Sequence, residues 1–377
     1  MQLTAEEYCL SDPRVARLLA GSPLRELSGR FRARMASAQS LERAWETAEA
    51  EGLSLWRTAR EAASTTSSED RTLYWTRLSL TAYLRRSYAA PFPVGHHDRE
   101  RLIALVERAS RGMSELSFHS APDVRHLLIS GFDPFRLDAA ADHSNPSGAA
   151  ALALDGQHIE CGGRRAQVRA VIFPVRFRDF DRGLVETTFR PFLTPRLDGT
   201  AAVDLLMTIS QNNTPGYDIE RWAGRRRTLE ARDNKGDYGA HTTTRGTSQI
   251  VPLGPTAGER EFEQTSLPVL AMLQAESLLG TDTLRENTSR LPEQGGPAVR
   301  GSGGNYLSNE VFYRAASLER TTRQVGALTR ESIPVGHLHV PLMEPPHTWS
   351  DDAAYAERRH QIAGHVGTIV RAALSGL

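Results

Sequence analysis

The sequence predicts an α/β protein with a mostly parallel, twisted sheet that is covered by helices on both faces and preceded by an all-helical region. After about residue 120, short apolar runs typical of strands buried on both faces alternate with helical segments. Before residue 120, apolar residues recur at the spacing of amphipathic helices, and few segments resemble strands. We therefore predict a helical N-terminal region over residues 1–120 and an α/β domain over residues 121–377.

Three to five helices are expected in the N-terminal region. The clearest helical spacing of apolar residues runs from 102 to 113, and two similar stretches precede it. A Ser/Thr-rich segment at 64–68 and a Pro-Phe-Pro sequence at 91–93 separate these stretches. Because aromatic side chains bury large areas, three tryptophans are expected to pack this region: Trp45, Trp56 and Trp75.

Four buried strands are predicted in the α/β domain, at residues 124–130, 167–175, 203–210 and 336–341. Helical segments lie between and after them, at residues 149–154, 184–193, 267–279 and 351–374. A polar, Gly-rich insert at 276–301 is interpreted as a surface flap or partner site. In such sheets, ligand sites form beyond the carboxyl ends of strands, where Gly131, Phe132 and Gln211 lie.

Composition argues against several classes of protein. The chain has 45 basic and 45 acidic residues, so its charge gives no reason to expect binding to nucleic acid or to an acidic membrane. No apolar run approaches the ~20 residues that span a bilayer. Residues 1–20 include Glu6 and Glu7 and lack a secretion signal, so we expect a cytoplasmic location. Cys9 and Cys161 are too few for a metal-ligand cluster, and we expect no metal or cofactor.

The most informative stretch for function runs from Gly303 to Tyr313. A Gly pair allows a sharp turn, and Ser308 follows it at the start of a helical pattern. Free backbone N–H groups and the helix dipole favour a developing anion at such a position, which suits a nucleophile. The alternative is a serine that only caps the helix, which is common at helix starts.

A serine nucleophile needs a base, and the base needs an orienting acid. His339 lies near the end of the last predicted strand, and Glu220 follows the third strand. The chain has 12 histidines and many carboxylates, so spacing alone does not single out this pair. A buried structural histidine and a surface ion pair remain the alternatives.

From about residue 124 to the end, the chain resembles pyroglutamyl peptidase I, a family of cysteine peptidases. Six blocks in the same order carry the resemblance, and their collinearity makes it specific. The first block looks like the GFxPF and NPS sequences of that family, and the last two look like its nucleophile and histidine segments. The blocks are residues 128–135 with 145–147, 171–175, 218–221 with 233–234, 265–268, 303–313 and 336–341.

This resemblance implies a phosphorylase–hydrolase type of α/β fold and a set of site residues. The implied catalytic triad is Ser308, His339 and Glu220, with serine at the cysteine position. The implied substrate site comprises two rings that hold a lactam and two polar side chains: Phe132, Phe135, Gln211 and Arg232. The implied reaction is removal of an N-terminal 5-oxoproline, or cleavage of a related amide, through an acyl-enzyme. Relatives often assemble into dimers or tetramers, so the resemblance implies a homo-oligomer unless the insert at 276–301 blocks assembly.

Three hypotheses follow, because a serine hydroxyl is deprotonated less readily than a thiol. The chain is an active hydrolase acting on a peptide or small amide, a cysteine enzyme whose nucleophile was replaced, or a disabled lactam-binding or scaffold protein. Glu310 places a carboxylate near Ser308, where it either assists a base or faces solvent. The basic triple Arg225–Arg227 is predicted to be a solvated loop, and the alternative is that it binds an acidic substrate group near Glu220.

Overall fold

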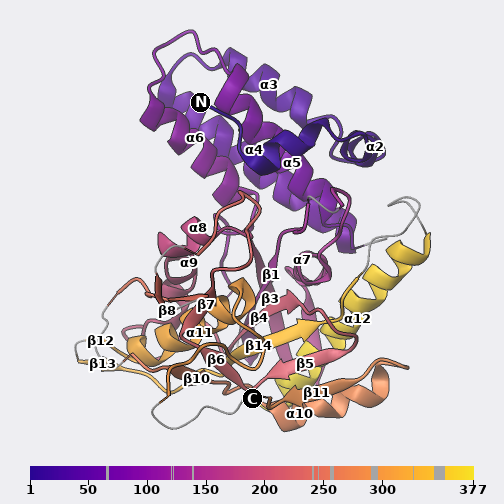
Figure 1. The fold of residues 1–377 in the computed structure, drawn as a ribbon, viewed down its shortest axis with the longest axis vertical. Helices are drawn as coiled ribbons and strands as arrows, with labels where there is room; N and C mark the ends of the chain where they lie inside the picture. The colour runs from indigo at the N-terminus through magenta and orange to yellow at the C-terminus, as the bar shows by residue number, and fades with distance from the viewer. Residues whose placement is uncertain are drawn as a thin grey trace.

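The computed structural model describes residues 1–64, 68–119, 121, 123–137, 140–239, 242–244, 246–254, 259–289, 296–325, 327–343 and 353–377. Part of the predicted loop at 64–68, part of the polar insert, and the first two residues of the predicted last helix lie outside this set. The helical N-terminal region stacks on one end of the α/β region (Figure 1). No helix among the described residues is long and apolar enough to cross a membrane.

The N-terminal region contains more helices than the three to five predicted. Its described α-helices are α1 (Ala5–Tyr8), α2 (Pro13–Ala20), α3 (Leu27–Ser37), α4 (Leu41–Ala62), α5 (Arg71–Ala82) and α6 (His96–Ala109). The short helices α1 and α2 were missed because they are too short to show an amphipathic repeat, although Asp12 caps α2 and Pro13 begins it. Trp56 and Trp75 are fully buried, as predicted.

The α/β region is built on a seven-stranded sheet with the order β11-β5-β14-β4-β1-β3-β2. The four central strands run parallel, whereas β5 is antiparallel to β14 and β2 is antiparallel to β3. The strands are β1 (Val124–Phe132), β2 (His158–Cys161), β3 (Arg164–Phe173), β4 (Leu205–Gln211), β5 (Tyr217–Glu220), β11 (Leu284–Asn287) and β14 (Val335–Val340). The predicted fold class, a mostly parallel sheet with a helical N-terminal region, is confirmed.

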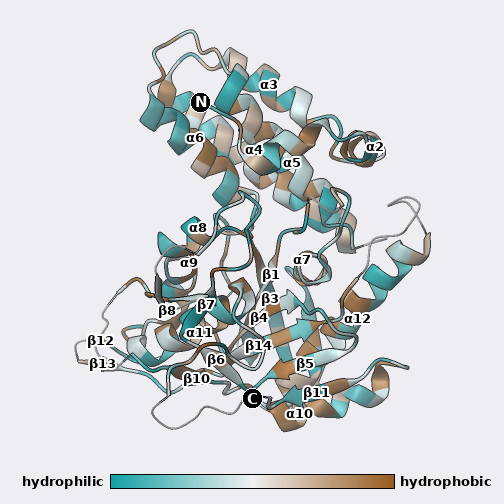
Figure 2. Cartoon of the chain, in the orientation of Figure 1, coloured by the Kyte–Doolittle hydropathy of each residue, from teal (hydrophilic) through white to brown (hydrophobic). Residues whose placement is uncertain are grey.

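Helices cover both faces of this sheet. Along β1, Leu127 and Ile129 point into one core cluster and Leu128 points into the other, as the alternation of a strand requires. The first cluster includes side chains of α7 (Pro146–Leu154), α10 (Val269–Leu273) and α12 (Ala353–Ser375). The second includes those of α8 (Phe177–Asp181), α9 (Leu184–Leu193) and α11 (Leu307–Thr322). Hydrophobic and hydrophilic residues alternate along the helices, as expected when one face is buried (Figure 2).

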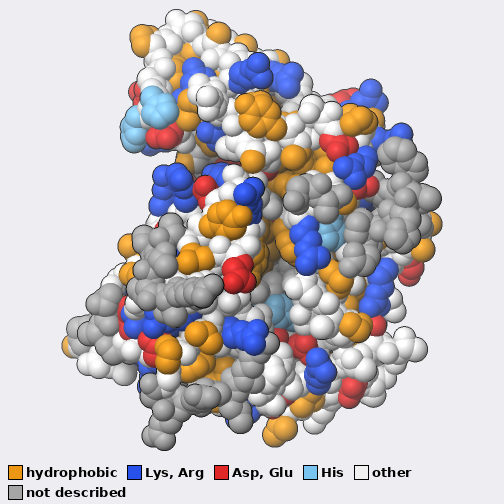
Figure 3. All heavy atoms as spheres, viewed as in Figure 1, with side chains coloured by type: hydrophobic (Ala, Val, Ile, Leu, Met, Phe, Trp, Pro, Cys, Tyr) orange, Lys and Arg blue, Asp and Glu red, His pale blue; other side chains and the backbone are white. Residues whose placement is uncertain are grey.

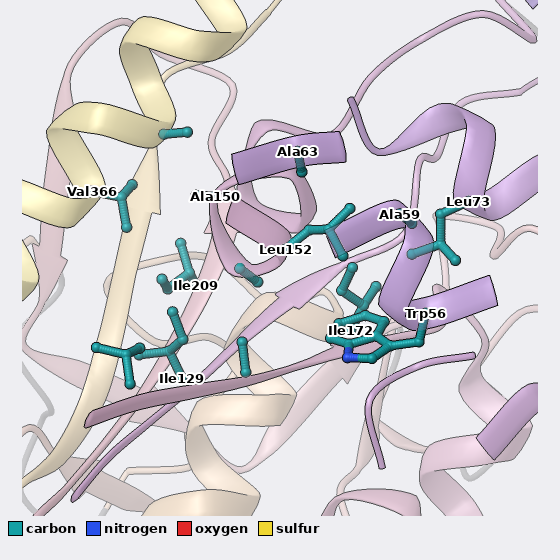
Figure 4. Close-up of a cluster of buried hydrophobic side chains, with 14 of the residues drawn as sticks. Trp56, Ala59, Ala63, Leu73, Ile129, Ala150, Leu152, Ile172, Ile209 and Val366 are labelled. Carbon is teal, nitrogen blue, oxygen red and sulfur yellow. The ribbon is translucent and has the colours of Figure 1, made fainter. Parts of the chain in front are cut away.

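The first core cluster continues without a break into the N-terminal region. Trp56 from α4 and Leu73 from α5 pack with Ile172 and Leu152 of the α/β region (Figure 4). The Trp56 indole also donates a hydrogen bond of 3.2 Å to Asp155. The two regions therefore share one hydrophobic core.

In the described part of the chain, three smaller sheets and several short helices complete the fold. The remaining strands are β6 (Trp222–Gly224), β7 (Arg226–Thr228), β8 (Thr242–Thr244), β9 (Thr247–Gln249), β10 (Phe262–Gln264), β12 (Gln324–Val325) and β13 (Leu328–Thr329). The short helices are η1 (Cys9–Ser11), η3 (Tyr83–Ser87) and η4 (Gln274–Leu278). The insert at 276–301 is not merely the predicted surface flap, because its residues 284–287 form β11 at the edge of the main sheet.

Candidate active site

A pocket of about 910 Å³ opens at the carboxyl ends of β1, β4 and β14. Six of the seven residues predicted for the site line it: Phe132, Phe135, Gln211, Arg232, Ser308 and His339. The seventh, Glu220, lies behind His339. The face of the molecule drawn in Figure 3 is hollowed near its centre, where hydrophobic side chains are exposed.

His339 and Glu220 form the tightest polar contact of the site. The Nδ1 atom of His339 lies 2.6 Å from Oε1 of Glu220, and both side chains are at most 3% exposed. Asn287 donates a 3.1 Å hydrogen bond to the other carboxylate oxygen and a second one to the backbone carbonyl of Ser302. Among the described residues, the Nε2 atom of His339 has no hydrogen-bond partner, and the ring lines the pocket. The imidazole is thus held from one side only.

The Gly303–Gly304 turn passes directly over this pair. A Cβ atom on Gly303 would lie 2.6 Å from the His339 ring and 3.0 Å from the Glu220 carboxylate carbon, so only glycine fits there. Gly304 has a φ of +100°, which also favours glycine. The Gly pair therefore brings the chain close enough to the imidazole for α11 to begin beside it.

Ser308 lies in the first turn of α11, half-buried in the pocket wall. Tyr306 occupies the N-cap position and supplies no side-chain cap, so the amides of residues 307–309 have no acceptor within the helix. The structure contains no hydrogen bond between the described side chains of Ser308 and His339. The structure thus brings His339 and Glu220 into contact. It places Ser308 in the same pocket but without a hydrogen bond to His339.

A second imidazole lies next to the first. His337 is two residues earlier on β14, and its ring meets the His339 ring edge-on at 4.6 Å between centroids. It bonds to the hydroxyls of Thr208 and Ser210 on β4, each at 2.8 Å. Burial, and to a lesser degree the neighbouring His339, hold the pKa of His337 well below its usual value. Burial therefore favours the neutral form of His337.

The side chains predicted to hold the substrate differ in how they are used. Phe132 is almost buried and stacks on Phe180 at 6.1 Å, so much of its ring belongs to the core. Phe135 is half-buried at the pocket wall. Both amide atoms of Gln211 are buried and lack hydrogen-bond partners within the described part of the chain. Arg232 is exposed and donates a 2.7 Å hydrogen bond to Tyr238.

Two charged features have other roles than those predicted. Glu310 neither assists a base nor faces solvent: it is fully buried between Arg227 and Arg314, at 2.7 and 2.8 Å. The Arg225–Arg227 triple is not a solvated loop, because Arg227 is fully buried in this network. Arg227 also pairs with Asp181, and Arg314 with Glu186, so Glu310 belongs to a buried ion-pair network. We assign this network a structural role beneath α11.

The N-terminal region also contributes to the pocket, which the sequence did not indicate. Ala5 of α1 and Cys9 line it. Glu6 anchors α1 through Arg176 at 2.6 Å and Tyr74 at 2.8 Å, although burial raises the pKa of Glu6. The sequence analysis also missed Asn287, which orients Glu220 and lies in the segment predicted to be a flap. No cluster of three or more His, Cys, Asp or Glu side chains that could hold a metal occurs in the described ranges.

Comparisons with known proteins place the chain in a family. Residues 126–269 and 274–344 match a family model described as the C-terminal domain of PA0049, and residues 1–107 match one described as the PA0049 N-terminal domain. The chain belongs to the PA0049 family. It is 28% identical to the uncharacterized protein PA0049 of Pseudomonas aeruginosa over an alignment of 396 positions, which covers 79% of this chain and 69% of that protein.

Solved structures give a more distant likeness. Pyrrolidone carboxyl peptidase from Thermus thermophilus has a TM-score of 0.42 and 22% identity over 67% of this chain and all of that one. The enzyme of the same name from Thermococcus litoralis has a TM-score of 0.42 and 16% identity, covering 67% and 94% of the two chains. A futalosine hydrolase mutant of Helicobacter pylori scores 0.28 at 11% identity, covering 66% and 99%. These likenesses concern the fold alone.

Proposed function

We propose that this protein hydrolyses an amide bond through an acyl-enzyme, with Ser308 as nucleophile, His339 as base and Glu220 as the orienting acid. The observation that carries the proposal is the 2.6 Å contact of His339 with Glu220 in the pocket that Ser308 lines. With Nδ1 committed to the carboxylate, Nε2 is the atom that takes up a proton. The carboxylate then stabilises the imidazolium that forms.

The reaction proceeds in two steps. Ser308 Oγ attacks the amide carbonyl while its proton moves to His339 Nε2, and the first-turn amides of α11 face the oxyanion. His339 then returns the proton to the leaving nitrogen, and the C–N bond breaks to give an ester on Ser308. Water, deprotonated by the same imidazole, releases the acid and restores the hydroxyl.

The lack of a bond between Ser308 and His339 does not exclude this chemistry. Catalytic hydrogen bonds are often long or misaligned in unliganded enzymes and tighten when substrate binds. Rotation of the serine side chain about χ1 moves Oγ without moving the helix. Bound substrate would displace water from the pocket and favour the bonded position.

For the substrate, we propose a flat, uncharged amide such as an N-terminal 5-oxoproline. The pocket offers aromatic carbon from Phe132 and Phe135, which suits a planar ring. The Nε2 group of Gln211 is a buried donor without a partner, and a ring carbonyl would satisfy it. The sequence resemblance to pyroglutamyl peptidase I supports the same substrate.

The experiment is release of a fluorescent amine from a pyroglutamyl amide by the natural chain, Ser308→Ala, Ser308→Cys and His339→Ala. Activity of the natural chain that is lost in Ser308→Ala and His339→Ala supports the proposal. Activity only in Ser308→Cys shows that the site is built for a thiol nucleophile.

A second candidate function is binding without turnover, which is favoured by the missing Ser308–His339 bond. It predicts that the natural chain binds a lactam but releases no amine. Ser308→Ala would then bind the lactam as tightly as the natural chain does.

A further inference from the structure

Ser210 and His337 form a second hydroxyl–imidazole pair within the proposed active site. Ser210 is 5% exposed and lines the pocket, and its Oγ lies 2.8 Å from His337 Nε2. The other ring nitrogen, Nδ1, lies 2.8 Å from Thr208 Oγ1. Neither His337 nor Thr208 lines the pocket, so Ser210 is the end of this chain that a ligand can meet.

The direction of the hydrogen bonds follows from counting protons. The Thr208 hydroxyl, which has a single proton, lies 3.1 Å from the carbonyl of Gly336 and 2.8 Å from His337 Nδ1. The carbonyl can only accept, so both hydrogen bonds form together only if the hydroxyl donates to the carbonyl and accepts from Nδ1. His337 Nδ1 therefore carries the ring proton. A neutral imidazole has only one N–H, so Nε2 is an acceptor and receives the proton of Ser210. The lone pairs of Ser210 Oγ are left for the pocket.

This pair is unsuited to nucleophilic catalysis. The groups that bond to or pack on His337 are the hydroxyls of Thr208 and Ser210, the ring of Phe312 at 6.2 Å, and His339. None of these is a carboxylate. Glu220 is the register partner of His337 on β5, but its carboxylate bonds to His339. If His337 took the proton of Ser210, an imidazolium would be buried beside a second imidazole without a carboxylate of its own. Ser210 is therefore equipped to bind rather than to attack.

The position of Ser210 indicates what it binds. In the sheet, Ser210 is the register partner of His339 on one side. On the other side of β4 lies β1, where Ser130 pairs with Thr208. Because the two strands are parallel, Phe132 and Ser210, each two residues further along, lie at matching positions. Ser210 thus lies on the pocket floor between the base and the aromatic side. In a 5-oxoproline, the ring N–H is attached to the carbon that bears the reacting carbonyl, and the ring carbonyl is bonded to the same nitrogen. The cis amide therefore presents its N–H and its C=O side by side on one edge of the ring.

We propose that Ser210 accepts a hydrogen bond from the ring N–H of the substrate, and that His337 is the positioning residue that keeps Ser210 an acceptor. The ligand class is a lactam or secondary amide whose free N–H is attached to the carbon that bears the reacting carbonyl. This inference rests on the proposed function for its substrate. Gln211 then serves the ring carbonyl, so the two neighbours on β4 bind the two adjacent polar groups of one lactam.

The first test measures the tautomer of His337 by ¹⁵N NMR of histidine-labelled protein, with His337→Phe used to assign the signal. We expect protonated Nδ1 and unprotonated Nε2, with an Nε2 shift that changes in Ser210→Ala. Thr208→Val removes the acceptor of the Nδ1 proton outside the pocket and is expected to shift the tautomer toward Nε2–H. A protonated Nε2 in the natural chain overturns the inference, since Ser210 would then be a donor.

The second test measures binding of 2-pyrrolidone and N-methyl-2-pyrrolidone by calorimetry, which needs no turnover. The natural chain should favour the N–H compound by about tenfold, the amount that one hydrogen bond supplies. Ser210→Ala should lose this preference, whereas the matched variant Gln211→Leu should bind both compounds more weakly and keep it. Equal weakening for both compounds in Ser210→Ala overturns the inference.

The two proposals fail in different ways. If the natural chain shows the preference but releases no amine from a pyroglutamyl amide, the hydrolase proposal fails and the assignment of Ser210 stands. If amine is released and Ser210→Ala keeps the preference, the hydrolase stands and the assignment of Ser210 fails.

Discussion

His337 and His339 are two residues apart on one strand, yet the structure equips them differently. Both are at most 3% exposed, and each bonds diagonally to a side chain on a neighbouring strand. His339 reaches the Glu220 carboxylate, whereas His337 reaches only hydroxyls. A buried imidazole holds a positive charge at low cost only when a negative group faces it. The comparison teaches that the partner, rather than the burial, decides which histidine can shuttle a proton.

Replacing each histidine in turn should produce the largest effects and tests directly whether the two rings have different roles. We expect His339→Ala to lower kcat/KM for a pyroglutamyl amide by a factor of about 10³–10⁴, the effect of removing a member of a working triad. His337→Phe should raise KM by about tenfold with little change in kcat, because it affects binding through Ser210. Steady-state kinetics of the two purified variants provide the measurement. Equal losses of kcat would show that both rings serve the chemistry.

The buried carboxyl of Asp70 provides a second test of how hydrogen-bond partners determine the charge of a buried group. Asp70 accepts hydrogen bonds from the Ser144 hydroxyl and from the Asn145 amide at 2.8 Å. Burial and the nearby Glu69 raise the pKa of Asp70 to about 6. The folded state then keeps a proton that the unfolded chain has lost, so the stability due to Asp70 falls as pH rises from about 4 to about 6.

We therefore expect the natural chain to lose about 3 kcal/mol relative to Asp70→Asn across that pH range, as a pKa raised from 3.8 to about 6 implies. Urea unfolding of both proteins at several pH values gives the difference. Glu69 adds little to this difference, because the adjacent Arg359 and Arg71 lower its pKa to about 2 and keep it ionised over this pH range. Parallel curves would show that Asp70 stays ionised in the folded protein.

The close approach of the Gly303 backbone to the His339 ring is the next feature that a substitution can test. In Gly303→Ala, the new Cβ would lie 2.6 Å from the imidazole, so the ring or the turn must move. Displacements of that size cost roughly 10²-fold in rate, and we expect that loss in kcat. Gly364→Ala on α12 is the matched control, because nothing lies within 4 Å of its Cβ. A fully active Gly303→Ala would mean that the position of the His339–Glu220 pair is not critical.

Much of this arrangement could be predicted from the sequence, because the relevant signals are local. Apolar runs gave the four central strands, and the Gly pair before Ser308 gave the start of α11. The strand that carries Glu220 was missed, since four residues are too few to show a strand pattern. The pairing of His339 with Glu220 came from the family resemblance and not from spacing, because a contact across 119 residues leaves no local periodicity.

Other features depend on tertiary contacts that no short pattern encodes. Asn287 was placed in a flap because its strand is polar and lies at the edge of the sheet. Arg227 and Glu310 looked exposed because charged residues usually are, and only the assembled fold shows that each buries the other. The role of His337 could not be predicted either, since its hydrogen-bond partners on β4 precede it by more than 120 residues.

The smallest effect expected concerns the pocket wall that the N-terminal region provides. Cys9→Trp would place a large ring beside Ala5 at that wall, while the His339–Glu220 pair remains untouched. We expect KM for a pyroglutamyl amide to rise by about tenfold with kcat within twofold, because the change reduces binding space and not chemistry. Cys161→Trp is the matched control: it lies on β2, outside the lining of the pocket, and should leave both constants unchanged. If Cys9→Trp matched the natural chain, the helical region would be a support for the sheet alone. A loss of kcat would instead mean that α1 helps to position the His339–Glu220 pair. The contacts that distinguish His339 from His337 would then include some made by the N-terminal region.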